Sequence, residues 1–180
     1  GNTASVTTPT LTNTTNYTVI GTSDGCKDTA IATVTVNAKP TVSVNSASIC
    51  EGETTDLTAS GATSYTWTPN IGNTASVTTP ALNSTTNYTV TGSDGTCENT
   101  AVATVTVKSK PSTPSITQNG GSDTIQSSTI VVGATYEWYK EGNLVATTNN
   151  PYYVIDTTGI YTVKVISLGC SSLVSNNFNA

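Results

Sequence analysis

Carboxylates are the first side chains in this sequence that could do chemistry. Glu51 and Glu53 lie two residues apart, and Asp94 and Glu98 lie four residues apart. Two carboxylates can share the acid and nucleophile roles of glycoside hydrolysis. The chain contains no histidine, the commonest general base, and no pattern joins these carboxylates to a nucleophile and an oxyanion hole. We therefore predict that they are solvating surface charges, that the protein is not an enzyme, and that it has no cofactor.

Acidic residues also recur at one hairpin of two similar segments, as Asp24 with Asp28 and as Asp94 with Glu98. Calcium takes six to eight oxygen ligands, and no D-x-D-x-D run supplies them here. The sequence predicts polar turns and no metal. A calcium site at a joint between segments is the alternative.

The remaining reactive side chains are four cysteines: Cys26, Cys50, Cys97 and Cys170. They are too far apart in sequence, and lack the histidines, for a zinc site. A bond between Cys50 and Cys97 would close a loop of about 47 residues, which the chain-entropy model values at about 4 kcal/mol. Such a bond would indicate an oxidising, extracellular compartment. We predict this pair and expect Cys26 and Cys170 to be unpaired in this chain, with an intermolecular bridge as the alternative for Cys170.

The segments that carry these residues repeat. Residues 1–40 match residues 72–111 without a gap at 27 of 40 positions, so the offset is 71 residues. A fixed period of this kind is typical of tandem modules. A Lys-Pro pair recurs at Pro40 and at Pro111, where proline fixes the backbone and lacks a donor. We divide the chain into the C-terminal part of a repeat (1–39), a complete repeat (40–110) and a divergent module (111–180).

Each segment has the pattern of short strands. β-Branched residues alternate with others over four to eight positions, turn signals such as Asp-Gly separate the runs, and no helical period occurs. In the complete repeat we expect strands at 41–44, 54–59, 64–68, 75–78, 87–91 and 100–107. The equivalents in the first segment are 4–7, 16–20 and 30–36. In the last segment we expect strands at 115–118, 123–128, 135–140, 143–148, 152–156, 160–166 and 172–175.

Aromatic residues on these strands indicate the type of all-β fold. Immunoglobulin-like sandwiches place a core Trp on the third strand and a corner Tyr near the sixth. Trp67 and Tyr88 take these places in the complete repeat, and Trp138 and Tyr161 take them in the last segment. We predict tandem immunoglobulin-like β-sandwich modules with a 71-residue repeat and these four aromatics in their cores. Two residues after each corner tyrosine, antibody domains have cysteine, and this chain has valine.

A longer pattern adds a resemblance. The complete repeat reads I-C-x-G-x-x-x-x-L-T-A-x-G-A-x-x-Y-x-W-x-P, then T-T-x-Y-T-V-T-G, then C-x-x-T-A-x-x-T-V-T-V. It resembles the Ig-like repeats of very large Bacteroidota surface proteins, including gliding-motility adhesins and other cargo of the type IX secretion system. The resemblance covers residues 1–110 closely. It implies a secreted, non-catalytic structural or adhesive segment at the bacterial cell surface, acting as a semi-rigid, disulfide-stapled stalk.

The same resemblance implies a modification. Secreted proteins of that phylum are O-glycosylated at Asp-Ser/Thr followed by an apolar residue or Thr. The sequence matches at Thr29, Thr124 and Thr157. The motif is short, and we keep these three as candidate sites.

The expected partners are neighbouring repeats of the same chain, followed by surface glycans or secretion and anchoring proteins. A net charge of −5 argues against a nucleic-acid partner, and the lack of eighteen consecutive apolar residues argues against membrane insertion. One alternative function is a polysaccharide-binding segment of a secreted enzyme, with Tyr139, Tyr152 and Tyr153 stacking on sugars. Another is secretion cargo bound to its export or anchoring machinery. Strand alternation favours core or scattered surface tyrosines over a sugar platform.

Overall fold

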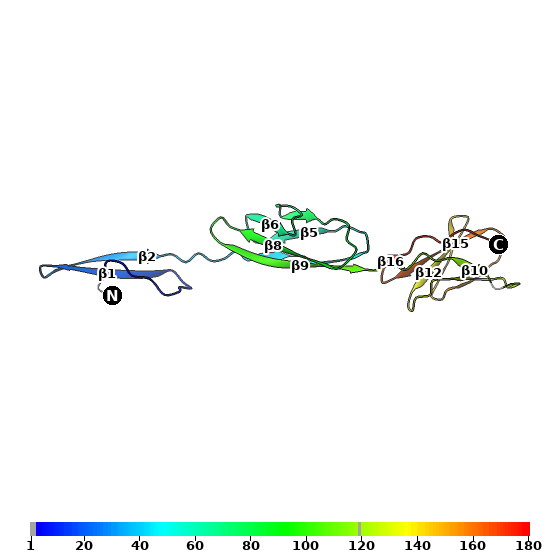
Figure 1. The fold of residues 1–180 in the computed structure, drawn as a ribbon, viewed down its shortest axis with the longest axis horizontal. Helices are drawn as coiled ribbons and strands as arrows, with labels where there is room; N and C mark the ends of the chain where they lie inside the picture. Colours follow the sequence, from blue (N-terminus) through cyan, green and yellow to red (C-terminus); the bar gives the residue numbers. More distant parts are fainter. Residues whose placement is uncertain (1–2, 119) are drawn as a thin grey trace.

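The computed structural model describes residues 3–118 and 120–180, and every regular element in that part is a β-strand. Those residues contain no helix able to cross a membrane. A hairpin and two sandwiches follow one another along the longest axis of the molecule (Figure 1). The predicted fold class, all-β with immunoglobulin-like sandwiches in tandem, is confirmed.

The first unit is a single antiparallel hairpin. β1 (Thr15–Ser23) pairs with β2 (Cys26–Val34) over their whole length. Asp24 and Gly25 form the turn with φ of 48° and 81°. Positive φ at both central residues gives a turn whose twist matches that of the strands, and Asp-Gly accepts it readily.

The strand expected at residues 4–7 does not form. Its equivalent in the next repeat is β7 (Ser76–Thr78), which pairs with β5 (Asp56–Ser60). Among the described residues, none ahead of β1 supplies a counterpart of β5. A strand without a partner leaves its backbone groups to water, so the pattern alone does not produce one.

The middle module, whose strands run from Ser43 to Lys108, is a sandwich of two sheets with strand orders β3-β5-β7 and β4-β9-β8-β6. Its other strands are β3 (Ser43–Val44), β4 (Ala47–Cys50), β6 (Ser64–Thr68), β8 (Thr86–Ser93) and β9 (Glu98–Lys108). Inward-facing residues of both sheets form one core around Leu57, Trp67 and Val90. Successive side chains of a strand face opposite sides, so the other residues of these strands face the solvent.

β4 is the strand of the middle module that the sequence did not predict. We expected no strand between residues 44 and 54, whereas a short strand ends at Cys50. β4 pairs in parallel with β9, from Ala47 opposite Val105 to Cys50 opposite Lys108. Four residues are too few for a clear alternation, and the partner lies far along the chain. This strand carries Cys50 to the end of the module at which β9 leaves it.

The last module, whose strands run from Ile116 to Asn179, has a second core between two sheets. One sheet has the order β10-β11-β14, and the other β13-β12-β15-β16, with β17 also pairing with β15. The strands are β10 (Ile116–Gln118), β11 (Thr124–Ser127), β12 (Thr135–Lys140), β13 (Asn143–Thr148), β14 (Tyr152–Val154), β15 (Ile160–Ser167), β16 (Cys170–Ser171) and β17 (Phe178–Asn179).

The strand expected at residues 172–175 is irregular chain instead. The hydroxyls of Ser172 and Ser175 accept hydrogen bonds from the backbone N–H groups of Val165 and Val163, at 3.0 and 2.9 Å. Serine hydroxyls compete in this way with a regular ladder of backbone bonds. The segment still covers β15, and both serines are buried.

Candidate functional site

The chemically distinctive feature of the molecule is a disulfide between modules. Cys50, at the end of β4, is bonded to Cys170, at the start of β16, with their Cα atoms 5.6 Å apart. The predicted bond between Cys50 and Cys97 is therefore wrong, and so is the expectation that Cys170 is unpaired. Within residues 3–118 and 120–180, Cys26 and Cys97 have no disulfide partner.

The length of β9 explains why Cys50 and Cys97 do not meet. Cys97 directly precedes β9, and Cys50 lies opposite Lys108 at the far end of that strand. At about 3.3 Å per residue, these positions are roughly 35 Å apart. Two cysteines can be bridged only when their Cα atoms lie within about 7 Å. The cysteines thus mark opposite ends of one module, and each faces a different neighbour.

Backbone and carboxylate contacts hold Cys50 in place. Its N–H donates to Oε2 of Glu53 at 3.1 Å, and the N–H of Glu51 donates to the carbonyl of Lys108 at 2.9 Å. Glu53 thereby stabilises the turn that follows the cysteine. Both glutamates are exposed. Of these two glutamates, Glu53 contacts the backbone of Cys50 through its carboxylate, and Glu51 contributes its backbone N–H.

A tight hairpin presents Cys170 to the joint. Leu168 and Gly169 form the turn between β15 and β16, with φ of 53° and 82°. Nζ of Lys108 donates to the carbonyl of Leu168 at 3.2 Å, and Sγ of Cys170 lies 4.0 Å from the carbonyl oxygen of Lys108. Cys170 is fully buried. The end of β9, the disulfide and the β15–β16 turn therefore meet at one place, which we call the second joint.

The first joint lies between the hairpin and the middle module. Nδ2 of Asn99 donates to the carbonyl of Pro40 at 3.0 Å, and Sγ of Cys97 lies 3.7 Å from the carbonyl oxygen of Asn37. Oδ1 of Asp94 accepts the N–H groups of Thr96 and Cys97 at 2.8 and 2.7 Å. These bonds favour the carboxylate and hold the pKa of Asp94 below its ordinary value. Asp94 therefore fixes the turn that carries Cys97.

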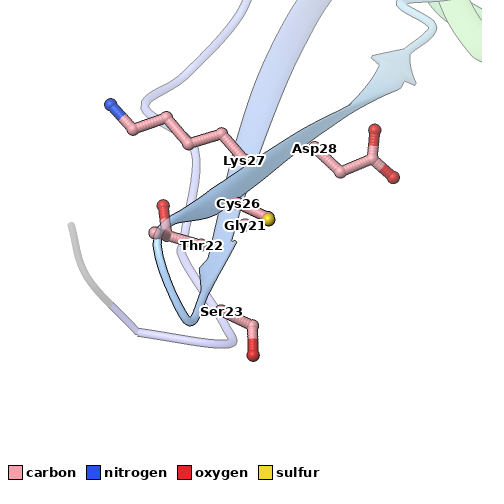
Figure 2. A pocket seen from close by; sticks show the side chains of 6 residues that line it. All are labelled: Gly21, Thr22, Ser23, Cys26, Lys27 and Asp28. Carbon is pink, nitrogen blue, oxygen red and sulfur yellow. The ribbon is translucent and has the colours of Figure 1, made fainter.

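Cys26 directly follows the corresponding turn of the first hairpin. Figure 2 shows it among the residues that line a small surface pocket at the hairpin end, with Thr22 and Asp28. Cys26 is exposed. Among the described residues, no three of His, Cys, Asp and Glu are grouped as they would be to hold a metal ion.

The four aromatic markers lie inside the two cores. Trp67 is 3% exposed and donates from Nε1 to the carbonyl of Thr74 at 3.0 Å, and Tyr88 is 1% exposed. Trp138 and Tyr161 are both fully buried. Each tryptophan lies opposite the valine that replaces the antibody cysteine, because Trp67 pairs with Val90 and Trp138 pairs with Val163.

The three tyrosines considered for sugar binding do not form a platform. Tyr153 stacks on the core residue Trp138 with ring centroids 5.8 Å apart. Tyr139 is half-buried, donates from its hydroxyl to Glu137 at 2.7 Å, and has Nζ of Lys164 5.5 Å from its ring centroid. Tyr152 alone among the three is exposed, at 48%.

The three candidate glycosylation threonines differ in access. Thr29 and Thr157 are exposed, and Thr124 is half-buried at the start of β11. The hydroxyl of Thr157 already accepts a hydrogen bond from Lys140 and donates one to Asp156. Thr29 is thus the most accessible of the three hydroxyls, and its modification stays a prediction.

No family model and no curated protein matches this sequence. Among solved structures, domains A168–A170 of titin are similar over 93% of this chain and 74% of theirs, with 14% identity and a TM-score of 0.49. Extracellular domains 3–5 of Drosophila OTK are similar over 92% and 69%, with 10% identity and a TM-score of 0.47. The BSP domain of a biofilm-associated protein is similar over 79% and 29%, with 18% identity and a TM-score of 0.34. Likenesses this distant carry no argument about function.

Proposed function

We propose that this chain is a non-catalytic structural segment of a secreted surface protein, in which a disulfide stiffens the joint between successive immunoglobulin-like modules. The bond between Cys50 and Cys170 is the observation that carries the proposal. The backbone already connects the modules once, between Lys108 and Ile116. One connection allows bending and twisting. A second covalent connection restricts both, because it enters the last module at Cys170, whereas the backbone enters its first strand at Ile116.

The further details of this proposal rest on the sequence. We propose module boundaries at residues 39/40 and 110/111, because the paired strands on either side of them belong to separate sheets. A disulfide suits an oxidising, extracellular compartment. The resemblance of residues 1–110 to Bacteroidota repeats supports a place at the bacterial cell surface, with neighbouring repeats as partners and type IX secretion as the export route.

Polysaccharide binding is the weaker candidate. Two of the three candidate tyrosines already contact other side chains. Tyr139 contacts Glu137 and Lys164, and Tyr153 stacks on the core residue Trp138. A single exposed aromatic side chain is ordinary on a protein surface.

NMR relaxation of backbone amides tests the stiffened joint. In the oxidised chain, the middle and last modules should tumble as one body. In a Cys50→Ser/Cys170→Ser double variant, the two modules should tumble separately, each with a shorter correlation time. Cys97→Ser is the matched control and should behave as the unaltered chain does. Identical tumbling in the double variant and the unaltered chain would refute a stiffening role for the bond.

A further inference from the structure

In three successive units, a cysteine follows the turn of a β-hairpin. Cys26 follows the β1–β2 turn, Cys97 follows the β8–β9 turn, and Cys170 follows the β15–β16 turn. Cys26 and Cys97 also coincide in the 71-residue repeat. Since Cys170 is bonded to the module before it, the other two are placed to bond in the same direction.

The surroundings of Cys97 at the first joint repeat those of Cys170 at the second. Sγ of Cys97 lies 3.7 Å from the carbonyl oxygen of Asn37, and Sγ of Cys170 lies 4.0 Å from that of Lys108. Asn37 and Lys108 are themselves 71 positions apart and therefore equivalent. At the second joint, the residue opposite Lys108 is the bonded Cys50. A cysteine opposite Asn37 would stand in the same relation to Cys97.

The first hairpin has an open edge for the strand that would carry that cysteine. β4 pairs with residues 105–108 of the middle module, and their equivalents are residues 34–37. In the described part of the chain, β2 pairs with β1 and has no strand on its other edge. A copy of β4 laid there in the same parallel register would end with its cysteine opposite Asn37.

The inward face of the hairpin also lacks its cover. Val19 is 56% exposed, whereas its equivalent in the complete repeat, Val90, is fully buried. Tyr17 is half-buried, whereas its equivalent, Tyr88, is 1% exposed. Counterparts of β3 and β5 would cover an apolar face of this kind, because β3 and β5 cover the equivalent face in the middle module.

We propose that Cys97 forms an inter-module disulfide with an early cysteine of the preceding repeat, 71 residues before Cys50, so that every joint of the repeat array is cross-linked. The inference rests on the proposed stalk function and extends it from one joint to all. Cys26 would be bonded in the same way to the repeat before that. Residues 111–169 contain no cysteine. The last module therefore bonds to the module before it through Cys170, and it has no counterpart of Cys50.

Forming the bond is a two-electron oxidation. The two thiols lose two protons and two electrons as the S–S bond forms. An oxidant of the disulfide class accepts them, as when oxidised glutathione becomes two molecules of the reduced thiol.

The test completes the first module. A copy of residues 40–71 is joined directly ahead of Gly1, which restores the register because Gly1 is equivalent to Gly72. The extended chain is oxidised with glutathione, and its disulfides are mapped by mass spectrometry of unreduced peptides. Hydrogen exchange at residues 15–34 reports whether the added strands have covered the hairpin.

The expected result is a bond between the added cysteine and Cys97, a retained bond between Cys50 and Cys170, and a free Cys26. Cys97→Ser should leave the added cysteine unbonded, and the matched control Cys26→Ser should leave the map unchanged. A bond to Cys26, a free Cys97 thiol, or a hairpin that gains no protection would each overturn the proposal. Those outcomes leave the stalk function standing, whereas loss of the Cys50–Cys170 bond would count against the stalk itself.

Discussion

The disulfide at the second joint should limit how far the protein can be stretched. When the chain is pulled from its two ends, the load reaches Cys50, crosses the sulfur atoms to Cys170 and continues toward Ala180. Residues 51–169 lie between the two bonded cysteines and carry no load. Unfolding them adds no length to the loaded path while the bond is intact.

The hidden length follows from the sequence separation of the two cysteines, which is 120 residues. A fully extended chain spans about 3.3–3.6 Å per residue, so reduction should release roughly 400–430 Å of additional length. The change is large beside the extension of the short segments that stay in the load path. It can therefore be distinguished from unfolding of the first hairpin.

Single-molecule force spectroscopy measures this difference directly. The chain is stretched by handles at its ends, first oxidised and then in the presence of a reducing thiol. The Cys50→Ser/Cys170→Ser double variant should reach the long extension under both conditions, and Cys97→Ser should keep the short one when oxidised. An oxidised, unaltered chain that reaches the full length of the reduced chain would refute the load path.

Three further predictions concern the modules. Trp67→Ala should lower the free energy of unfolding of the middle module by about 3–5 kcal/mol in urea titrations, because it empties a core position, and a loss below about 1 kcal/mol would contradict the assigned core. Tyr161→Phe should cost the last module about 1–2 kcal/mol, since the hydroxyl of this buried residue donates to the carbonyl of Thr157 at 2.7 Å and lies 3.2 Å from Oδ1 of Asp156, and an unchanged urea midpoint would argue against these contacts. In NMR spectra, the amide signal of Cys97 should titrate with a midpoint below about 3.9, and Asp94→Ala should abolish this titration. Folding lowers the pKa of Asp94, so its contribution to the folding free energy is present above the ordinary aspartate pKa. That contribution is lost as the pH falls through the lowered pKa. A midpoint at or above about 3.9 would show that the carboxylate does not hold the turn.

The core was predictable because its signal is local. Alternation places Tyr65 and Trp67 on one face of β6, and both are buried. The Asp-Gly turn of the first hairpin follows from residues that accept positive φ. Neither inference needs knowledge of a distant partner, which is why both could be made from a single segment.

The prediction of the disulfide failed because it assumed that a module is stapled internally. That assumption treats sequence proximity and module membership as guides to spatial proximity. The length of β9 decides the matter instead. Cys97 precedes the start of β9, and the parallel pairing of β4 places Cys50 beside its end. β4 itself gives too short a pattern to be recognised in the sequence.

The sequence by itself determined the period, the all-β class and the four aromatic residues of the two cores, because repetition and alternation can be read along the chain. The tertiary structure decided which cysteines meet. Cys50 and Cys170 are 120 residues apart, and they are neighbours only because one module stacks end to end on the next. A covalent bond forms between atoms that are close in space, and at the joint of two modules that closeness is a property of the assembled fold rather than of either repeat.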